Sequence, residues 1–317
     1  MKVTSDKGPT AAPDLALVRA GLARARAIAR SHASPLVRAA RLLRCPERRA
    51  LFDCTYAAMR IVDDAVDATP RRPQRAVAAH VDRWLTQAVA AMRGRFRPGP
   101  DSYEPALFAA LDRYGGGSTI GPTPWRKLAR ALRTDIAGRK LATWRDFMTY
   151  AEGASVAPAA IFIYVIGCEV GRGSRTRISL PLPPAAYARD LALFCYLVHM
   201  LRDLAPDVRA GVTTLPADLL RRTRLDRGRL ARAVRAHDAP ALLPLASALL
   251  VKAAGFRERA DEALEALEPR LEVDAKAALG GVRVRYEATY AVLAADYARY
   301  LESTGWGAAA AASARPE

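Results

Sequence analysis

The chain has 317 residues, of which 51% are hydrophobic, and its formal net charge is +17. That hydrophobic share is ample for a core and excludes a mainly disordered chain. The positive charge is spread along the whole chain without a nucleic-acid-binding motif, so we expect solvated, arginine-rich helix faces and no nucleic-acid partner. The alternative is that the positive charge serves to bind an anionic substrate or an anionic membrane surface, so a peripheral membrane contact is possible.

Helical periodicity begins at residue 14 and dominates the first half of the chain. Asp14 is an N-cap candidate ahead of an amphipathic helix with an arginine-rich outer face. Pro46 opens a long helix that is expected to run to about Asp67. The other helices predicted in this half cover residues 36–43, 74–93, 106–113 and 125–138.

In the second half, Thr143 is expected to cap a helix that runs to Gly167 and is bent or interrupted at Pro158. The pattern then predicts a loop over 171–184, a helix over 185–204, a loop over 205–216, and helices over 226–237, 240–268 and 273–302. No alternating strand pattern is visible. We therefore expect an all-α fold with a single domain over 14–302, flanked by flexible tails over 1–13 and 303–317.

The cysteines and the N-terminus indicate a cytoplasmic protein. The four cysteines lie in apolar contexts without metal-ligand spacing, so they are expected to be reduced core residues. They are Cys45, Cys54, Cys168 and Cys195. Residues 1–14 are polar and contain proline, which argues against a signal peptide. The longest uncharged apolar segment, 155–168, is too short to span a bilayer.

Two pairs of aspartates, each four residues apart, stand at the polar ends of apolar helical stretches. They are Asp63 and Asp67 in RIVDDAVD, and Asp203 and Asp207 in YLVHMLRDLAPD. Residues four apart share one face of a helix, but solvated surface helices carry the same spacing. The apolar flanks distinguish these two pairs, because carboxylates at the ends of buried helices can converge across the interior of a bundle.

Converging carboxylates without His or Cys in metal spacing suit a hard cation. Mg²⁺ prefers oxygen ligands and is commonly shared between carboxylates and the phosphates of a substrate. Arg60 and Arg202, next to the two pairs, could neutralise a departing diphosphate. We therefore expect Mg²⁺ as the cofactor. No NADPH-binding motif is visible, so no reductive step is expected.

The same stretches resemble a known family. Residues 56–67 and 197–216 are similar to the two Asp-rich motifs of the phytoene/squalene synthase family, and 150–167 to its kinked helix. The resemblance covers about residues 30–295. It implies an isoprenoid-synthase helical bundle with a central cavity, in which Mg²⁺ on two DxxxD motifs binds allylic diphosphates. It places the metal ligands at Asp63, Asp67, Asp203 and Asp207, and further family positions at Tyr56, Arg60, Asp64 and Arg202.

The chain departs from the family pattern at three places. The second motif usually reads Gln-x-x-Asn-x-x-Arg-Asp, and here Tyr196 and His199 replace the Gln and the Asn. The family's Arg-x-Tyr-Leu-Pro is Val-Thr-Thr-Leu-Pro at 212–216, and its His-Ser-x-Ser-Phe is His-Ala-Ser-Pro-Leu at 32–36. In head-to-head synthases these positions help to hold two diphosphates, so the changes argue against that reaction while leaving diphosphate ionisation intact.

The resemblance and its departures favour transfer of a prenyl group to an aromatic, indole- or carbazole-type acceptor in secondary metabolism, as in carbazole prenyltransferases. The bulky Phe162, Tyr164 and Tyr196 would shorten the cavity towards a short donor such as dimethylallyl diphosphate, and Phe194 is a further lining candidate. His199 would accept the ring proton, unless it is a hydrogen-bonded core histidine.

Two alternatives stay open. The first is head-to-head condensation of two allylic diphosphates to a phytoene- or squalene-type product. The second is a non-catalytic partner protein that keeps the fold, although in such relatives the Asp motifs are typically eroded and here they are intact. The acceptor, the donor length and the oligomeric state do not follow from the sequence.

Overall fold

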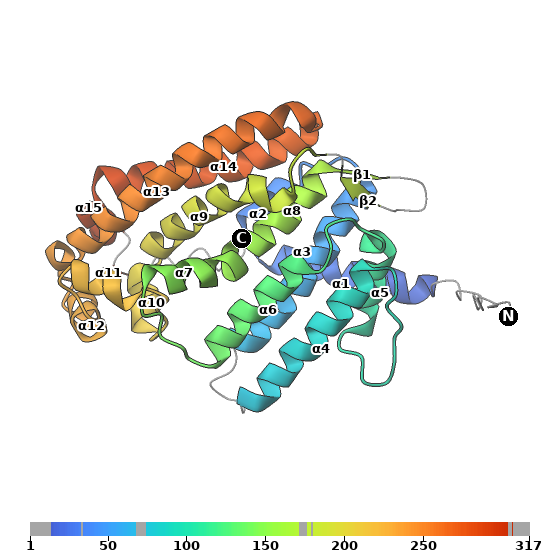
Figure 1. The fold of residues 1–317 in the computed structure, drawn as a ribbon, viewed down its shortest axis with the longest axis horizontal. Coiled ribbons are helices and arrows are strands. Elements are labelled where there is room, and N and C mark those ends of the chain that lie inside the picture. The colour runs from blue at the N-terminus through green and yellow to red at the C-terminus, as the bar shows by residue number, and fades with distance from the viewer. Residues whose placement is uncertain are drawn as a thin grey trace, which may run out of the picture.

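Helices form nearly all of the regular structure (Figure 1). The structure is a computed structural model that describes residues 14–32, 34–67, 74–170, 176–178, 180–303 and 306. The helices of the first half are α1 (Leu15–Ser31), α2 (Pro35–Ala40), α3 (Pro46–Asp67), α4 (Gln74–Met92), α5 (Pro105–Gly115), α6 (Thr123–Ile136), α7 (Trp144–Ala151), the π-helical turn η2 (Glu152–Val156) and α8 (Ala157–Gly167). The strands β1 (Cys168–Val170) and β2 (Thr176–Ile178) follow. The second half contains α9 (Pro184–Arg202), α10 (Leu204–Arg209), α11 (Ala217–Arg222), α12 (Arg227–Arg235), α13 (Ala239–Leu267), the 3₁₀ turn η4 (Glu268–Arg270), α14 (Val273–Ala295) and α15 (Tyr297–Ser303).

The prediction of an all-α fold is confirmed, and so are the helix starts that rest on local chemistry. The Asp14 carboxylate accepts hydrogen bonds from the backbone N–H groups of Ala16 and Leu17, at 2.9 and 3.3 Å. Thr143 and Asp146 form a reciprocal capping box at the start of α7. All four cysteines are free.

The helix predicted over 143–167 changes pitch before the proline that was expected to bend it. The π-helical turn η2 separates α7 from α8, and Pro158 lies in the first turn of α8. A proline is tolerated there because its missing N–H has no partner within the helix anyway. Gly153 in η2 lies against α6 so closely that an added Cβ would stand 2.2 Å from the backbone oxygen of Lys127. The π-helical turn η2 is therefore also the place where this segment packs closely against α6.

The prediction of a structureless loop over 171–184 was wrong at one point. Strand β2 pairs antiparallel with β1, in a register that sets Glu169 opposite Arg177. Three residues per strand are too few to display an alternating pattern, which is why the sequence did not reveal this hairpin. Residues 171–175, between the strands, lie outside the described residues.

Further corrections concern the C-terminal third. The predicted loop over 205–216 contains α10, and α11 was not predicted. The helix predicted over 273–302 is two helices, α14 and α15, separated at Asp296. The predicted N-terminal tail lies outside the described residues. Of the predicted C-terminal tail, Ser303 and Trp306 are described, and Trp306 is buried.

The helices that carry the two acidic motifs, α3 and α9, pack into the centre of the bundle. Helix α9 packs against α8, α13 and α14, while α3 packs against α1, α5 and α8. A buried arginine anchors the start of α3. Arg48 donates to the backbone oxygen of Cys168 at 2.9 Å and to both carboxylate oxygens of Glu272, at 2.9 and 3.1 Å. These bonds tie α3 to β1 and to the residue that precedes α14.

Two helical stretches, Trp144–Gly167 and Ala239–Arg270, are long and apolar enough to cross a membrane by length and composition alone. This is weak evidence, because core helices of soluble proteins pass the same test. The first stretch is 61% buried inside the protein over its most apolar window, whereas the second is 39% buried.

Candidate active site

Both acidic motifs open onto one cavity of about 580 Å³. Its walls come from α2, α3, α9, α14 and α15, with contributions from α6, η2 and α8. Six of the predicted site residues line it: Tyr56, Arg60, Asp63, His199, Arg202 and Asp203. The segment 32–36, where the chain departs from the family pattern, also contributes to the lining. The two motifs, distant in the sequence, therefore face the same cavity. Each contributes one arginine and one aspartate to its lining: Arg60 and Asp63 from the first, Arg202 and Asp203 from the second.

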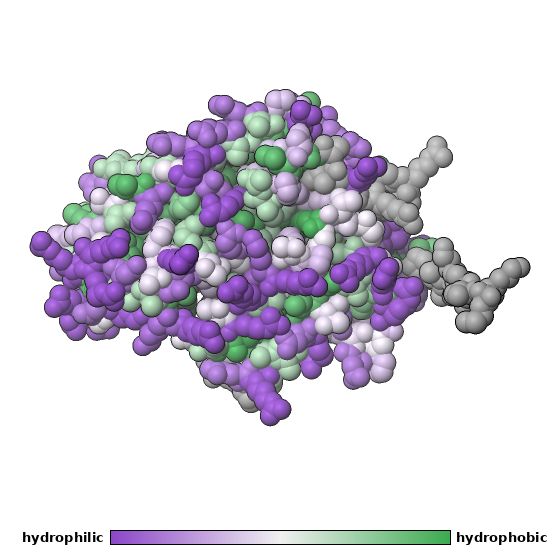
Figure 2. All heavy atoms as spheres, viewed as in Figure 1, coloured by the Kyte–Doolittle hydropathy of each residue, from purple (hydrophilic) through white to green (hydrophobic). Residues whose placement is uncertain are grey.

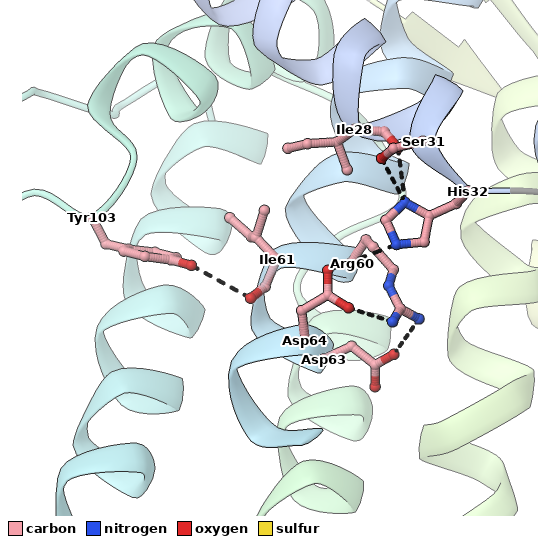
Figure 3. Close-up of polar contacts among 8 residues, drawn as sticks. All are labelled: Ile28, Ser31, His32, Arg60, Ile61, Asp63, Asp64 and Tyr103. Carbon is pink, nitrogen blue, oxygen red and sulfur yellow. Dashed lines mark hydrogen bonds and ion pairs between the residues drawn. The ribbon is translucent and has the colours of Figure 1, made fainter. Parts of the chain in front are cut away.

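In the first motif, Arg60 holds two carboxylates of its own helix (Figure 3). Its Nη1 donates to Asp63 Oδ2 at 2.9 Å, and its Nη2 donates to Asp64 Oδ1. The imidazole of His32 lies on the other side of Asp64, with Nε2 3.8 Å from Asp64 Oδ2. Its Nδ1 lies 2.9 Å from the carbonyl oxygen of Ile28, which can only accept, so we assign a proton to Nδ1.

In the second motif, Arg202 forms a bidentate pair with Asp203, with distances of 2.8 Å from Nε to Oδ1 and 2.5 Å from Nη2 to Oδ2. The same Nη2 lies 2.9 Å from Nδ1 of His199, whose Nε2 lies 3.2 Å from Asp203 Oδ2. Asp203 stands between α9 and α10, so the motif turns a corner and does not continue one helix. The four-residue relation persists, because the N–H of Asp207 donates to the carbonyl oxygen of Asp203 at 3.0 Å.

Each motif contains a carboxylate with a raised pKa, although an arginine lies beside each pair. Burial raises the pKa of Asp63 to about 6, helped by the nearby Asp67 and opposed by Arg60. Burial also raises the pKa of Asp207 to about 6, helped by Asp203 and opposed by Arg202. The Asp63 side chain is still 44% exposed, so solvent screens part of this effect. Such sites are stabilised by a bound cation.

The donor set fits Mg²⁺ in chemistry, because the charged oxygen ligands come from aspartates. Within the described residues, however, no three His, Cys, Asp or Glu side chains converge as a ready-made metal site. Asp64, Asp67 and Asp207 lie outside the cavity lining, and Asp64 and Asp67 are exposed. The two motifs thus supply separate carboxylate pairs, and a shared ligand is needed to join them.

A third carboxylate, which was not predicted as a site residue, lies beside the first pair. Asp135, near the end of α6, accepts a hydrogen bond from the Tyr150 hydroxyl at 3.1 Å. Burial raises its pKa to about 6, opposed by the hydrogen bond from Tyr150 and helped by the charges of Asp63 and Asp67. The available signal was weak, since Asp135 is an isolated acid on a helix that is otherwise basic.

Tyr196 links this carboxylate to the second motif. Its hydroxyl interacts with the side chains of Tyr150 and Thr214, which both affect its pKa. The negative charges of Asp135 and Asp207 both contribute to raising its pKa to about 12, although burial is the largest cause. Together, Asp135, Tyr150 and Tyr196 therefore lie within electrostatic range of both acidic pairs.

Two cationic side chains of the cavity were also missed. Arg38 of α2 and Arg285 of α14 line it and are exposed, and within the described part of the chain neither forms an ion pair. Both are arginines in a chain with many exposed arginines, so no local pattern distinguishes them. With Arg60 and Arg202 they make the polar rim of the cavity rich in guanidinium groups.

The predicted aromatic lining is wrong for this cavity. Phe162, Tyr164, Phe194 and Tyr196 are not among its lining residues. The first three are buried and Tyr196 is half-buried. Three of them contact another aromatic ring: Phe162 contacts Phe52, Phe194 contacts Tyr290, and Tyr196 stacks on Phe147. The hydroxyl oxygen of Tyr164 accepts a hydrogen bond from the N–H of Thr119. The apolar lining consists of Leu36, Met59, Leu128, Ala154 and Pro158 together with Ala205, Pro206, Leu301 and Trp306.

Comparisons with known proteins agree with this arrangement. The family model described as squalene/phytoene synthase matches residues 29–306. Among solved structures, the squalene synthase HpnC from Alicyclobacillus acidocaldarius is similar, with 18% identity and a TM-score of 0.67 over 87% of this chain and 94% of that one. A dehydrosqualene synthase in complex with ligand shows 16% identity and a TM-score of 0.64, covering 85% and 84%. A complex of TcSQS with the ligand E5700 shows 14% identity and a TM-score of 0.61 over 86% of this chain and 78% of that one.

At these identities the solved structures establish the fold, which is the all-α isoprenoid-synthase bundle. A comparison with curated protein sequences gave no match. The family model spans both acidic motifs and the helices between them, and members of that family are prenyltransferases. This chain belongs to the squalene/phytoene synthase family.

Proposed function

We propose that the protein is a Mg²⁺-dependent prenyltransferase that ionises an allylic prenyl diphosphate and couples it head to head with a second one. The observation that carries this proposal is the meeting of Arg60–Asp63 and Arg202–Asp203 on one cavity with an apolar wall. The likeness to solved squalene and dehydrosqualene synthases supports this alternative over an aromatic acceptor.

The polar rim is assigned to the diphosphate. Asp63, Asp67, Asp203 and Asp207 would hold Mg²⁺, and the ion when bound neutralises the charge that develops on the leaving diphosphate. Arg38 and Arg285 have no ionic partner among the described residues, so their guanidinium groups are available for phosphate oxygens.

The apolar wall is assigned to the prenyl chain. Leu128, Ala154 and Pro158 exclude water from the space beside the acidic motifs, which protects an allylic cation from hydrolysis. Tyr56 also lines the cavity and stacks on Phe52, with ring centroids 5.7 Å apart. Its ring face can stabilise positive charge by a cation–π interaction.

The aromatic-acceptor hypothesis loses two of its supports. The aromatic side chains that were expected to shorten the cavity do not line it. Arg202 lies against the lone pair that His199 would use as a base. The departure at Thr214 also has a local counterpart, because the tyrosine side chain absent there is present at Tyr196, whose hydroxyl interacts with Thr214.

The test is product analysis with Mg²⁺ and allylic diphosphates of increasing length, with and without a carbazole or indole acceptor. We expect a C30 or C40 hydrocarbon skeleton without any acceptor. A prenylated acceptor and no such product would overturn the head-to-head reading and restore the aromatic one. If no diphosphate is consumed under any condition, the non-catalytic reading stands.

Matched variants make that test specific. Asp63→Asn and Asp203→Asn should each lower turnover by about 10²–10⁴-fold, because each removes charge that stabilises the leaving group. Glu258→Gln, an exposed carboxylate on α13, is the control and should leave turnover unchanged.

A further inference from the structure

One end of the molecule carries a concentration of arginines that the proposed chemistry does not use. Residues 217–238, which contain α11 and α12, hold seven arginines against three aspartates. Figure 2 shows largely hydrophilic residues at the end of the molecule where Figure 1 places these helices. The exposed arginines are Arg221, Arg222, Arg224, Arg229, Arg232 and Arg235.

Most of these charges lack an acidic partner. Arg229 lies 3.5 Å from Asp226, which also caps α12, whereas none of the other five forms an ion pair with a described residue. Three of the exposed arginines, Arg224, Arg229 and Arg232, line a shallow depression of about 440 Å³. Among the described residues of its lining, Asp238 is the one acid, so arginines outnumber acids there by three to one. Guanidinium groups in excess around a depression suit phosphate oxygens, which they can bind with two parallel hydrogen bonds.

An apolar helix face adjoins the arginines directly. Pro244 of α13 lines the same depression as the three arginines. The first half of α13, residues 239–251, contains no charged residue. Its inner face is buried and its outer face is exposed, with Leu243 41% and Val251 70% accessible to solvent. The outward residues are Pro240, Leu243, Pro244, Ser247 and Val251.

The apolar surface continues towards α14. A groove of about 730 Å³ runs between α13 and the C-terminal half of α14, and Leu243, Leu250, Val251 and Leu293 are among its lining residues. Helix α13 cannot be a spanning helix in this fold, because Leu242, Leu245 and Leu249 are buried along its inner face and the helix packs against α9. It can, however, lie flat in an interface with its outer face in the acyl region.

We propose that α11, α12 and the outer face of α13 form a docking surface for an anionic lipid bilayer. The arginines would contact lipid phosphates, and Leu243 and Val251 would enter the acyl boundary beside them. Membrane binding that combines a polybasic patch with an apolar face is stronger than either alone. The cavity of the active site is lined by other residues, among them Tyr286 and Tyr300, and shares none with the depression or the groove.

The test is co-sedimentation of the full chain with vesicles of phosphatidylcholine alone or mixed with phosphatidylglycerol. We expect binding to the anionic vesicles, weakened by salt because exposed charges are screened. Each arginine near the surface contributes about five-fold in affinity, so Arg224→Glu, Arg229→Glu and Arg232→Glu together should lower binding on the order of 100-fold or more.

The matched control carries the same charge change elsewhere. Arg19, Arg93 and Arg95 are exposed, lie on and beside α1 and α4, and form no ion pair with a described residue. Their reversal to Glu should change vesicle binding only a few-fold. Equal losses in both triple variants would show diffuse attraction and overturn the docking surface. Circular dichroism and a thermal melt establish that each variant is folded.

A second pair of variants tests the apolar part. Leu243→Asp with Val251→Asp should lower vesicle binding on the order of tenfold or more, whereas Leu15→Asp, at an equally exposed position on α1, should not. Inorganic phosphate should compete poorly with vesicles, since it offers no acyl region. Absence of vesicle binding, or retention on single-stranded RNA that the α11–α12 arginines control, would overturn the proposal.

Discussion

The Arg202 guanidinium lies 2.9 Å from Nδ1 of His199, and this contact fixes where the imidazole proton lies. A guanidinium can only donate, so Nδ1 must accept and the proton of the neutral ring is on Nε2. That N–H points at Asp203 Oδ2, 3.2 Å away. Burial lowers the pKa of His199, which keeps the ring neutral near pH 7. Both ring nitrogens are therefore engaged in positioning Arg202 and Asp203.

This arrangement predicts that asparagine can replace His199. The asparagine oxygen can accept from Arg202 and its NH₂ group can donate to Asp203. We expect His199→Asn to keep kcat/KM within about tenfold, and His199→Ala to lose about 10–100-fold, since a hydrogen bond to a charged group is removed. Steady-state kinetics across pH 5–9 measure both. A pH limb that is present in the wild type and absent from His199→Asn would instead identify His199 as a proton acceptor.

Features that depend on neighbours in the sequence were predicted, whereas features that depend on packing between distant segments were not. Asp14, Thr143 and the apolar flanks of the acidic motifs act within a few residues of the chain, so they could be found from local pattern. Asp135 and Arg285 reach the site through helix packing, which leaves no local signal. The aromatic residues on α8 and α9 were misplaced because α8 is apolar all round and α9 is apolar over most of residues 191–201, so periodicity did not indicate which face meets the cavity.

Acidification should weaken magnesium binding at the site. The pKa of Asp63 and of Asp207 is raised to about 6, so both carboxylates are ionised at pH 7.5 and lose charge as the pH falls through 6. Because metal binding displaces these protons, kcat/KM at low Mg²⁺ should fall below about pH 6, and saturating Mg²⁺ should move this limb to lower pH. A limb that does not respond to Mg²⁺ would contradict the assignment.

The same raised pKa values affect stability with the opposite sign. Between about pH 4 and 6 the folded state binds more protons at Asp63 and Asp207 than the unfolded chain does, so these groups stabilise the metal-free protein as the pH falls. Mg²⁺ with inorganic diphosphate should therefore raise the melting temperature more at pH 7.5 than at pH 5.5. Asp63→Asn should remove most of this difference, while Glu258→Gln should keep it.

Gly153 is expected to be intolerant of any side chain. An added Cβ would stand 2.2 Å from the Lys127 carbonyl oxygen and 2.8 Å from the Ala131 side chain, so Gly153→Ala must push η2 away from α6. We expect a loss of about 1–3 kcal/mol in the free energy of unfolding, measured by urea denaturation. Gly280→Ala on α14 is the control, since nothing lies within 4 Å of its added Cβ, and it should be neutral or stabilising by up to about 1 kcal/mol. Equal effects of both would contradict the close approach.

Helix α15 holds the end of α9, where the second motif begins. The last carbonyl groups of a helix lack intrahelical donors. Here the Tyr297 hydroxyl donates to the carbonyl oxygen of Leu201, and the Tyr300 hydroxyl donates to that of Arg202, both at 3.0 Å. Tyr297 is 4% exposed, so Tyr297→Phe leaves a buried carbonyl without its donor and should cost about 1–2 kcal/mol in the free energy of unfolding.

Tyr300→Phe should separate stability from function. Tyr300 lines the cavity and its hydroxyl fixes the backbone of Arg202, so we expect a smaller stability loss than for Tyr297→Phe and a weaker affinity for Mg²⁺-diphosphate. Calorimetric titration measures that affinity. Tyr114→Phe is the control, because its hydroxyl has no hydrogen-bond partner within the described residues and both quantities should stay unchanged. If Tyr297→Phe and Tyr300→Phe reduced diphosphate affinity equally, α15 would act on the second motif as a rigid unit and Tyr300 would have no separate positioning role.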